Sequence, residues 1–139
     1  MVVTDWLIDK SALVRLAEAR DAQAWLDRCQ QAVVRIATPT LLEVGYSARS
    51  GEDWGRLTNG APVSWLPVQY VTSRAEQRAL EIQGHLATRG HHRAPSIPDL
   101  LVAAIAEDAG LTVLHLDKDY ELIAEVTGQP TERLALVGE

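Results

Sequence analysis

Short apolar segments alternate along this chain with longer segments of helical periodicity. The clearest apolar segments are residues 2–9, 33–37 and 111–116, and the nearly all-apolar stretch 97–109 reads as a buried helix. Strands that alternate with helices are joined by right-handed crossovers and form parallel sheets covered on both faces. We therefore expect a three-layer α/β/α domain with a central, mostly parallel sheet of four or five strands.

The composition is that of a globular protein. Of 139 residues, 47% are hydrophobic and 23% are charged, and a chain of this length can bury a core without disulfides. The single Cys29 excludes an internal disulfide framework and suits a reducing compartment. Because no segment resembles a signal peptide or a membrane span, we expect residues 1–139 to form one cytoplasmic domain.

Capping residues predict where several elements begin and end. Ser11 is a suitable N-cap for a helix over residues 12–19, and Gly110 closes the helix over 97–109. Residues 134–137 are predicted to add a final edge strand.

Four carboxylates occupy equivalent places in four separate segments. Asp9 ends the first strand, Asp117 ends the last well-defined strand, and Glu43 and Asp99 each lie one turn into a helix. In open α/β sheets the ligand crevice lies outside the carboxyl ends of the strands, where the following helices begin. We therefore expect these side chains to converge on one pocket, with Asp119 two residues beyond Asp117.

A cluster of this kind requires a cation. Four neighbouring carboxylates repel one another strongly, and Mg²⁺ or Mn²⁺, which prefer oxygen ligands, relieve that repulsion. A divalent ion held by carboxylates can polarise a phosphodiester and activate water in line with it. Zinc fits less well, because no pair of histidines lies at ligand spacing near these acids.

Each carboxylate also has a purely structural interpretation. Two of them fit the capping-box pattern, as the pairs Thr40 with Glu43 and Ser96 with Asp99. Asp9 alone is compatible with a turn, and Asp117 and Asp119 with the dipole of the next helix. The set favours a site, because four separate segments place an acid at the same predicted edge.

Four segments in a fixed order carry a family resemblance. They are Ile8-Asp9-Lys10-Ser11-Ala12-Leu13, Thr38-Pro39-Thr40-Leu41-Leu42-Glu43-Val44, Ile97-Pro98-Asp99-Leu100-Leu101-Val102-Ala103-Ala104 and Leu114-His115-Leu116-Asp117-Lys118-Asp119-Tyr120. Together they resemble the PIN domain and, more narrowly, the VapC toxins of prokaryotic VapBC toxin–antitoxin modules. The resemblance spans essentially the whole chain. It implies a Mg²⁺- or Mn²⁺-dependent endoribonuclease, usually a homodimer, neutralised by a small VapB-like antitoxin whose tail covers the active site.

The resemblance also implies roles for individual residues. By position, Asp9, Glu43, Asp99 and Asp117 would be the catalytic acids. Asp9 and Asp99 would hold the metal most directly, and Glu43 and Asp117 would complete its shell and orient the attacking water. Asp119 matches the second acid of the family's D-x-D pattern and would also bind metal.

Other residues are expected around this site. Ser11 matches a small hydroxyl residue that commonly lines it, and Tyr120 replaces a frequent Phe at a packing position. The basic residues expected to contact RNA are Lys10, Arg15 and Arg93, with Arg49 and Arg89 as further candidates.

Taken alone, the formal net charge of −6 argues against a nucleic-acid ligand, since phosphate binding usually requires a basic surface. Four of the nineteen acidic residues, however, belong to the predicted metal site. The acidic balance therefore allows an RNA substrate, while it excludes a broad basic surface that grips RNA without the metal.

Two other functions stay open. The segment Leu116-Asp117-Lys118-Asp119 also resembles the nucleophile motif of haloacid-dehalogenase-like phosphatases, although that motif normally opens the fold. The acidic pocket is also compatible with a non-catalytic, metal-binding interaction domain. Binding of Mg²⁺ without cleavage of RNA would favour the second alternative.

Overall fold

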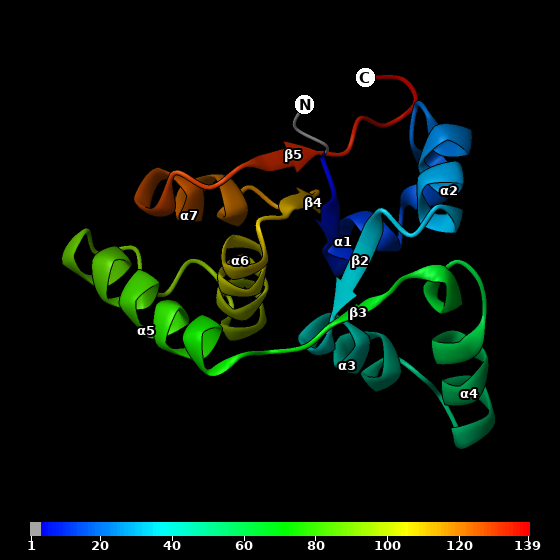
Figure 1. The fold of residues 1–139 in the computed structure, drawn as a ribbon, viewed down its shortest axis with the longest axis horizontal. Helices are drawn as coiled ribbons and strands as arrows, with labels where there is room; N and C mark the ends of the chain where they lie inside the picture. Colours follow the sequence, from blue (N-terminus) through cyan, green and yellow to red (C-terminus); the bar gives the residue numbers. More distant parts are fainter. Residues whose placement is uncertain (1–3) are drawn as a thin grey trace.

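A parallel sheet of five strands lies at the centre of the computed structural model, which describes residues 4–139 (Figure 1). The strands are β1 (Trp6–Ile8), β2 (Val34–Ala37), β3 (Val68–Gln69), β4 (Thr112–His115) and β5 (Thr131–Arg133). Their order is β3-β2-β1-β4-β5, and every pairing is parallel. This confirms the predicted architecture; residues 2 and 3 of the predicted first strand lie outside the described part.

Helices cover both faces of the sheet. One face carries α5 (Ser73–Thr88), α6 (Ile97–Ala109) and α7 (Asp119–Thr127). The other carries α1 (Lys10–Leu13), the short 3₁₀ helix η1 (Leu16–Glu18) and α2 (Ala22–Gln30). The segment between β2 and β3 forms α3 (Thr38–Tyr46), α4 (Gly51–Asn59) and the 3₁₀ helix η2 (Val63–Trp65). Helix α3 begins at the end of β2, and α4 packs against α3 and η2, away from the sheet (Figure 1).

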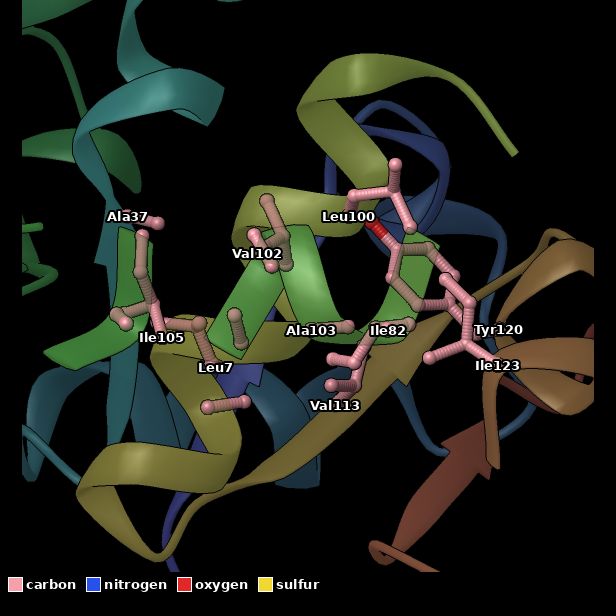
Figure 2. Close-up of a cluster of buried hydrophobic side chains, with 14 of the residues drawn as sticks. Leu7, Ala37, Ile82, Leu100, Val102, Ala103, Ile105, Val113, Tyr120 and Ile123 are labelled. Atoms are coloured by element: carbon pink, nitrogen blue, oxygen red, sulfur yellow. The ribbon is translucent and has the colours of Figure 1, made fainter. Parts of the chain in front are cut away.

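The core consists of two clusters, one on each face of the sheet. Successive residues of a strand point to opposite faces, so Leu7 belongs to the cluster under α5, α6 and α7, while Ile8 belongs to the cluster under α1 and α2. Figure 2 shows the first cluster, which includes Leu7 and Val113 of the sheet and Val102 of α6. Full burial of side chains of this size stabilises the fold by about 1.5–3 kcal/mol each.

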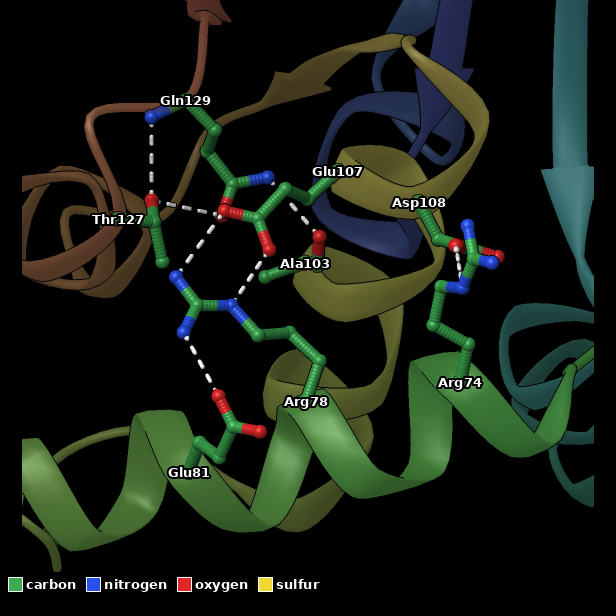
Figure 3. A network of polar contacts seen from close by, with 8 residues as sticks. All are labelled: Arg74, Arg78, Glu81, Ala103, Glu107, Asp108, Thr127 and Gln129. Carbon is green, nitrogen blue, oxygen red and sulfur yellow. Dashed lines mark hydrogen bonds and ion pairs between the residues drawn. The ribbon is translucent and has the colours of Figure 1, made fainter.

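A polar network joins the helices of that same face at their solvent side (Figure 3). The guanidinium of Arg78 in α5 donates to both carboxylate oxygens of Glu107 in α6, at 2.6 and 3.2 Å, and also to Glu81 at 3.1 Å. The amide of Gln129 donates to the carbonyl oxygen of Ala103 at 2.9 Å. Bidentate pairs of this kind fix orientation, so the network holds α6, whose first turn carries a candidate site residue.

Two local predictions are wrong. The helix predicted over residues 12–19 is divided into α1 and η1, and its cap is Asp9, whose carboxylate accepts a hydrogen bond from the backbone N–H of Ser11. Only Asp9 separates the helix from β1, so the cap falls at Asp9, two residues before Ser11. The strand predicted over residues 134–137 is also wrong: β5 ends at Arg133, and beyond it Ala135 and Val137 form backbone hydrogen bonds with Arg20 and Glu18 instead of with the sheet.

Within residues 4–139, no helix has both the length and the apolar character that crossing a membrane requires.

Candidate active site

The carboxyl ends of β1 and β4 meet at one edge of the sheet. Asp9 follows β1, and its backbone N–H donates to the carbonyl oxygen of Leu114 at 2.9 Å. From β1 the chain proceeds outward to β2 and β3 and then returns to β4 on the other side of β1. The order of the strands therefore reverses here, which is where open α/β sheets form their ligand crevices.

A pocket of about 390 Å³ opens at this edge. It is lined by Asp9, Lys10, Ser11, Val14, Glu43, Ala94, Ser96, Asp99, Asp117 and Asp119. The structure thus brings together all five acids that the sequence singled out, together with Lys10 and Ser11.

The carboxylate of Asp9 is held at both oxygens. Its Oδ2 accepts hydrogen bonds from the backbone N–H of Ser11 at 3.1 Å and from the Ser11 hydroxyl at 2.7 Å. Its Oδ1 accepts a hydrogen bond from the hydroxyl of Tyr120 at 2.7 Å. The Ser11 hydroxyl also accepts from the backbone N–H of Leu116 at 2.9 Å. Ser11 therefore links the end of β1 to the end of β4 and orients Asp9 between them.

Asp99 both takes part in the capping box of α6 and lines the acidic pocket. The capping box with Ser96 is formed: Ser96 Oγ accepts from the Asp99 N–H at 3.2 Å, and Asp99 Oδ2 accepts from the Ser96 N–H at 3.4 Å. The other oxygen, Oδ1, lies 3.2 Å from the Tyr120 hydroxyl. Burial, and then the negative charges of Asp9 and Asp117, raise the pKa of Asp99 to about 6.

Glu43 does not form the capping box with Thr40 that its structural interpretation required. Helix α3 begins at Thr38 and has Ala37 at its cap position, so Thr40 already lies inside the helix. Its buried hydroxyl has no hydrogen-bond partner. The Glu43 carboxylate lines the pocket instead, and burial followed by the charge of Asp9 raises its pKa, against an opposing effect of Lys10.

Asp117 and Asp119 complete the acidic set. Asp117 Oδ1 accepts from the backbone N–H of Asp119 at 2.9 Å, at the start of α7. Asp99, Asp117 and Asp119 each offer one carboxylate oxygen, and these oxygens lie within 4.8 Å of one another. Burial and the neighbouring Asp117 raise the pKa of Asp119.

The chemistry of this set fits a hard divalent cation. All donors are carboxylate oxygens, the ligands that such ions prefer. In the part of the chain from residue 4 onward, none of the five acids forms an ion pair with a lysine or arginine. Asp9 was expected to be among the most direct ligands, but its oxygens are not in the group formed by Asp99, Asp117 and Asp119. The hydroxyl of Tyr120 lies between the carboxylates of Asp9 and Asp99 and contacts both.

Tyr120 is the site residue that sequence reasoning missed. Its packing role is real, because it is fully buried in the cluster that contains Leu100 and Ile123 (Figure 2). Its hydroxyl, however, contacts the carboxylates of both Asp9 and Asp99. A buried tyrosine hydroxyl needs a hydrogen-bond partner, and its position directly after Asp119 was the available signal.

The predicted basic residues divide into one that lines the pocket and four that do not. Lys10 lines it, whereas Arg93, Arg49 and Arg89 are exposed outside it. Arg15 is also outside and forms an exposed ion pair with Glu18 at 3.2 Å. A continuous helix would have kept Arg15 one turn beyond Ser11 on the same face, but α1 ends before it.

Comparisons with known proteins identify the family. A model of the PIN domain matches residues 6–126. The chain is 58% identical over 129 residues to Ribonuclease VapC2 of Mycobacterium tuberculosis, covering 93% of this chain and 92% of that protein. The chain belongs to the VapC family of PIN domains. A second VapC relative from the same species, Ribonuclease VapC51, is 41% identical and covers 96% of this chain and 95% of its own length.

Solved VapBC structures share the fold of this VapC-family chain. The DNA-bound VapBC of Salmonella typhimurium has a TM-score of 0.75 at 20% identity, covering 94% of this chain and 98% of that one. VapBC2 of Rickettsia felis, bound to a promoter DNA fragment, has a TM-score of 0.76 at 14% identity with the same coverage. The phosphatase alternative finds no support in these relatives. A phosphatase motif would follow the first strand, whereas the segment Leu116–Asp119 follows β4.

Proposed function

We propose that this VapC-family PIN domain is the toxin of a type II toxin–antitoxin module and hydrolyses phosphodiester bonds in RNA. The observation that carries the proposal is that five carboxylates surround one pocket, at the point where the order of the strands reverses. Within residues 4–139, none of these carboxylates forms an ion pair with a lysine or arginine. The relatives named ribonucleases, which match almost the whole chain, support the same reaction.

The cofactor of this reaction is Mg²⁺ or Mn²⁺. Asp99, Asp117 and Asp119, whose oxygens lie within 4.8 Å of one another, would hold the ion together with Asp9. A divalent ion bound there supplies Lewis acidity to the phosphodiester and to an attacking water.

The protein groups around that centre have distinct tasks. Glu43 lines the pocket without belonging to the closest set of oxygens, and its raised pKa makes it a better proton acceptor than an ordinary glutamate. We assign to Glu43, with Asp117, the orientation of the attacking water. Lys10 lies in the same pocket and would contact a phosphate group of the RNA, whereas Ser11 keeps Asp9 in place.

The partners proposed for this domain are RNA, a VapB-like antitoxin and a second copy of the chain. An apolar groove of about 620 Å³ adjoins the acidic pocket and shares Lys10 and Glu43 with it. Leu42 and Tyr46 line this groove and are 69% and 90% exposed. An antitoxin tail would place apolar side chains in the groove and a basic side chain against the carboxylates. Light scattering of the free toxin and of the complex tests both assemblies.

The function is tested by cleavage of a mixed RNA pool with Mn²⁺. We expect Asp9→Ala and Asp99→Ala to abolish cleavage, and Asp21→Ala, which removes an exposed acid outside the pocket, to leave it unchanged. Full activity of both pocket variants would contradict the proposal. Binding of Mg²⁺ without cleavage by the wild-type protein would favour the non-catalytic alternative.

A further inference from the structure

A single hydroxyl group connects two of the site carboxylates. Tyr120 Oη donates to Asp9 Oδ1 at 2.7 Å and lies 3.2 Å from Asp99 Oδ1, within hydrogen-bonding distance. Asp9 follows β1 and Asp99 lies in the first turn of α6, so the phenol joins two separate elements. Among the hydrogen bonds of residues 4–139, no other side chain contacts both of these carboxylates.

The other oxygen of each carboxylate is already fixed locally. Ser11 holds Oδ2 of Asp9, and Ser96 holds Oδ2 of Asp99. These local contacts orient each carboxylate with respect to its own element, but none of them joins one carboxylate to the other. The hydroxyl of Tyr120 provides that link, because its oxygen lies within hydrogen-bonding distance of one oxygen of each carboxylate, and the two carboxylates would otherwise repel each other.

Packing alone does not explain the hydroxyl. The ring of Tyr120 is fully buried among apolar side chains such as Leu100 and Ile123, a position that phenylalanine would also fill. Burial of a hydroxyl group is costly unless the group is hydrogen-bonded. The carboxylates therefore provide the hydrogen-bond partners that the buried hydroxyl needs, and the hydroxyl in turn holds the two carboxylates at a fixed spacing.

We propose that Tyr120 is a positioning residue, which aligns the carboxylates of Asp9 and Asp99 for binding of a divalent cation. The inference rests on the proposed function, since it assigns Tyr120 to the same metal centre. Groups that orient metal ligands typically change metal affinity by about 10–100-fold when they are removed. The chain without this hydroxyl has to align the two carboxylates at the moment of binding, which weakens binding.

The test compares the wild-type protein with Tyr120→Phe, which removes only the hydroxyl. Tyr70→Phe is the matched control, because Tyr70 is 69% exposed and lines neither the acidic pocket nor the groove. Binding of MnCl₂ is measured by isothermal titration calorimetry, and folding by circular dichroism. We expect Tyr120→Phe to bind Mn²⁺ about tenfold more weakly with an unchanged spectrum, and Tyr70→Phe to bind as the wild type does. Equal or tighter binding by Tyr120→Phe would overturn the inference.

Cleavage distinguishes a failed inference from a failed function. If Tyr120 acts through the metal, Tyr120→Phe needs about tenfold more Mn²⁺ for half-maximal cleavage, and its rate at saturating Mn²⁺ changes less. Wild type and Tyr120→Phe that bind and cleave alike would contradict the inference and leave the function intact. A wild-type protein that neither binds Mn²⁺ nor cleaves RNA would contradict both.

A second measurement does not depend on the folding of the variant. The chain has three tyrosines, so incorporation of 3-fluorotyrosine gives three ¹⁹F resonances. Tyr46→Phe and Tyr70→Phe assign two of them, and the third belongs to Tyr120. Titration with Mg²⁺ should shift the resonance of buried Tyr120, because the oxygens that it contacts acquire a new partner, and leave that of Tyr70 in place. A Tyr120 resonance that does not move at saturating Mg²⁺ would refute the positioning role.

Discussion

The hydroxyl of Ser11 donates a hydrogen bond of 2.7 Å to Oδ2 of Asp9 and accepts one of 2.9 Å from the backbone N–H of Leu116. One small side chain thus ties the carboxyl ends of β1 and β4 together and orients the first acid of the pocket. The relation explains why a hydroxyl residue is useful two positions after Asp9, although it is not the helix cap.

Ser11→Ala is expected to lower both stability and activity. The substitution leaves the Leu116 N–H without its acceptor, and a buried polar group left unpaired costs about 1–3 kcal/mol. Asp9 also loses one of its three donors. Urea unfolding and RNA cleavage measure the two effects.

The control for this substitution is Ser50→Ala. Ser50 caps α4 by accepting from the backbone N–H of Asp53 and does not line the acidic pocket. Loss of such a cap costs about 0.5–2 kcal/mol, so this variant should be less stable but fully active. Equal activity of the two variants would argue against a role of Ser11 in the site.

Glu43→Gln separates water orientation from metal binding. The substitution keeps the shape of the side chain and removes its ability to accept a proton. We expect cleavage to fall by about 10²–10⁴-fold, with Mn²⁺ binding close to that of the wild type, because Glu43 is outside the closest set of oxygens. Calorimetry and cleavage on the same preparation provide the comparison. Loss of Mn²⁺ binding would instead make Glu43 a metal ligand.

The pKa of Asp99 predicts a pH dependence of the metal-free protein. Burial and the charges of Asp9 and Asp117 raise this pKa from 3.8 to about 6, so the folded state binds the proton more tightly than the unfolded chain does. The stabilisation that results is fully present below pH 3.8 and is lost as the pH rises through about 6. Asp99→Asn, which cannot titrate, should lack this contribution.

Urea unfolding in EDTA between about pH 4.5 and 7.5 tests this linkage. The free energy of unfolding of the wild type should fall relative to that of Asp99→Asn as the pH rises. Taking the difference between the two proteins removes the contribution of other groups, including His115, whose pKa burial lowers. Parallel curves for the two proteins would show that Asp99 does not titrate in this range.

The positions of the acids were predictable from the sequence, because topology determines them. Asp9 and Asp117 each follow an apolar strand, and parallel strands end at the same edge of a sheet. The order of strands and helices could also be predicted, because the apolar segments of the strands are continuous and the buried apolar residues of α5 recur at helical spacing. These features depend on periodicity, which a sequence displays directly.

The hydrogen bonds within the site were not predictable in this way. The capping-box pattern occurs at both Thr40 and Ser96, but only the helix that begins after Ser96 forms the box. A shift of three residues decides the difference, because the cap of α3 is Ala37 and not Thr40, and element boundaries are the least certain part of sequence reasoning. The contacts of Tyr120 with Asp9 and Asp99 join residues far apart in the chain, so no local pattern contains them.

The acidic pocket is proposed to cleave RNA with a divalent metal. The most direct measurement is cleavage of a mixed RNA pool by the wild-type protein in Mg²⁺, in Mn²⁺ and in EDTA, followed by addition of excess Mn²⁺ to the EDTA sample. We predict cleavage with either metal, none in EDTA, and recovery when Mn²⁺ is restored, with no cleavage by Asp99→Ala under any condition. Undiminished cleavage in EDTA, or by Asp99→Ala, would contradict the account.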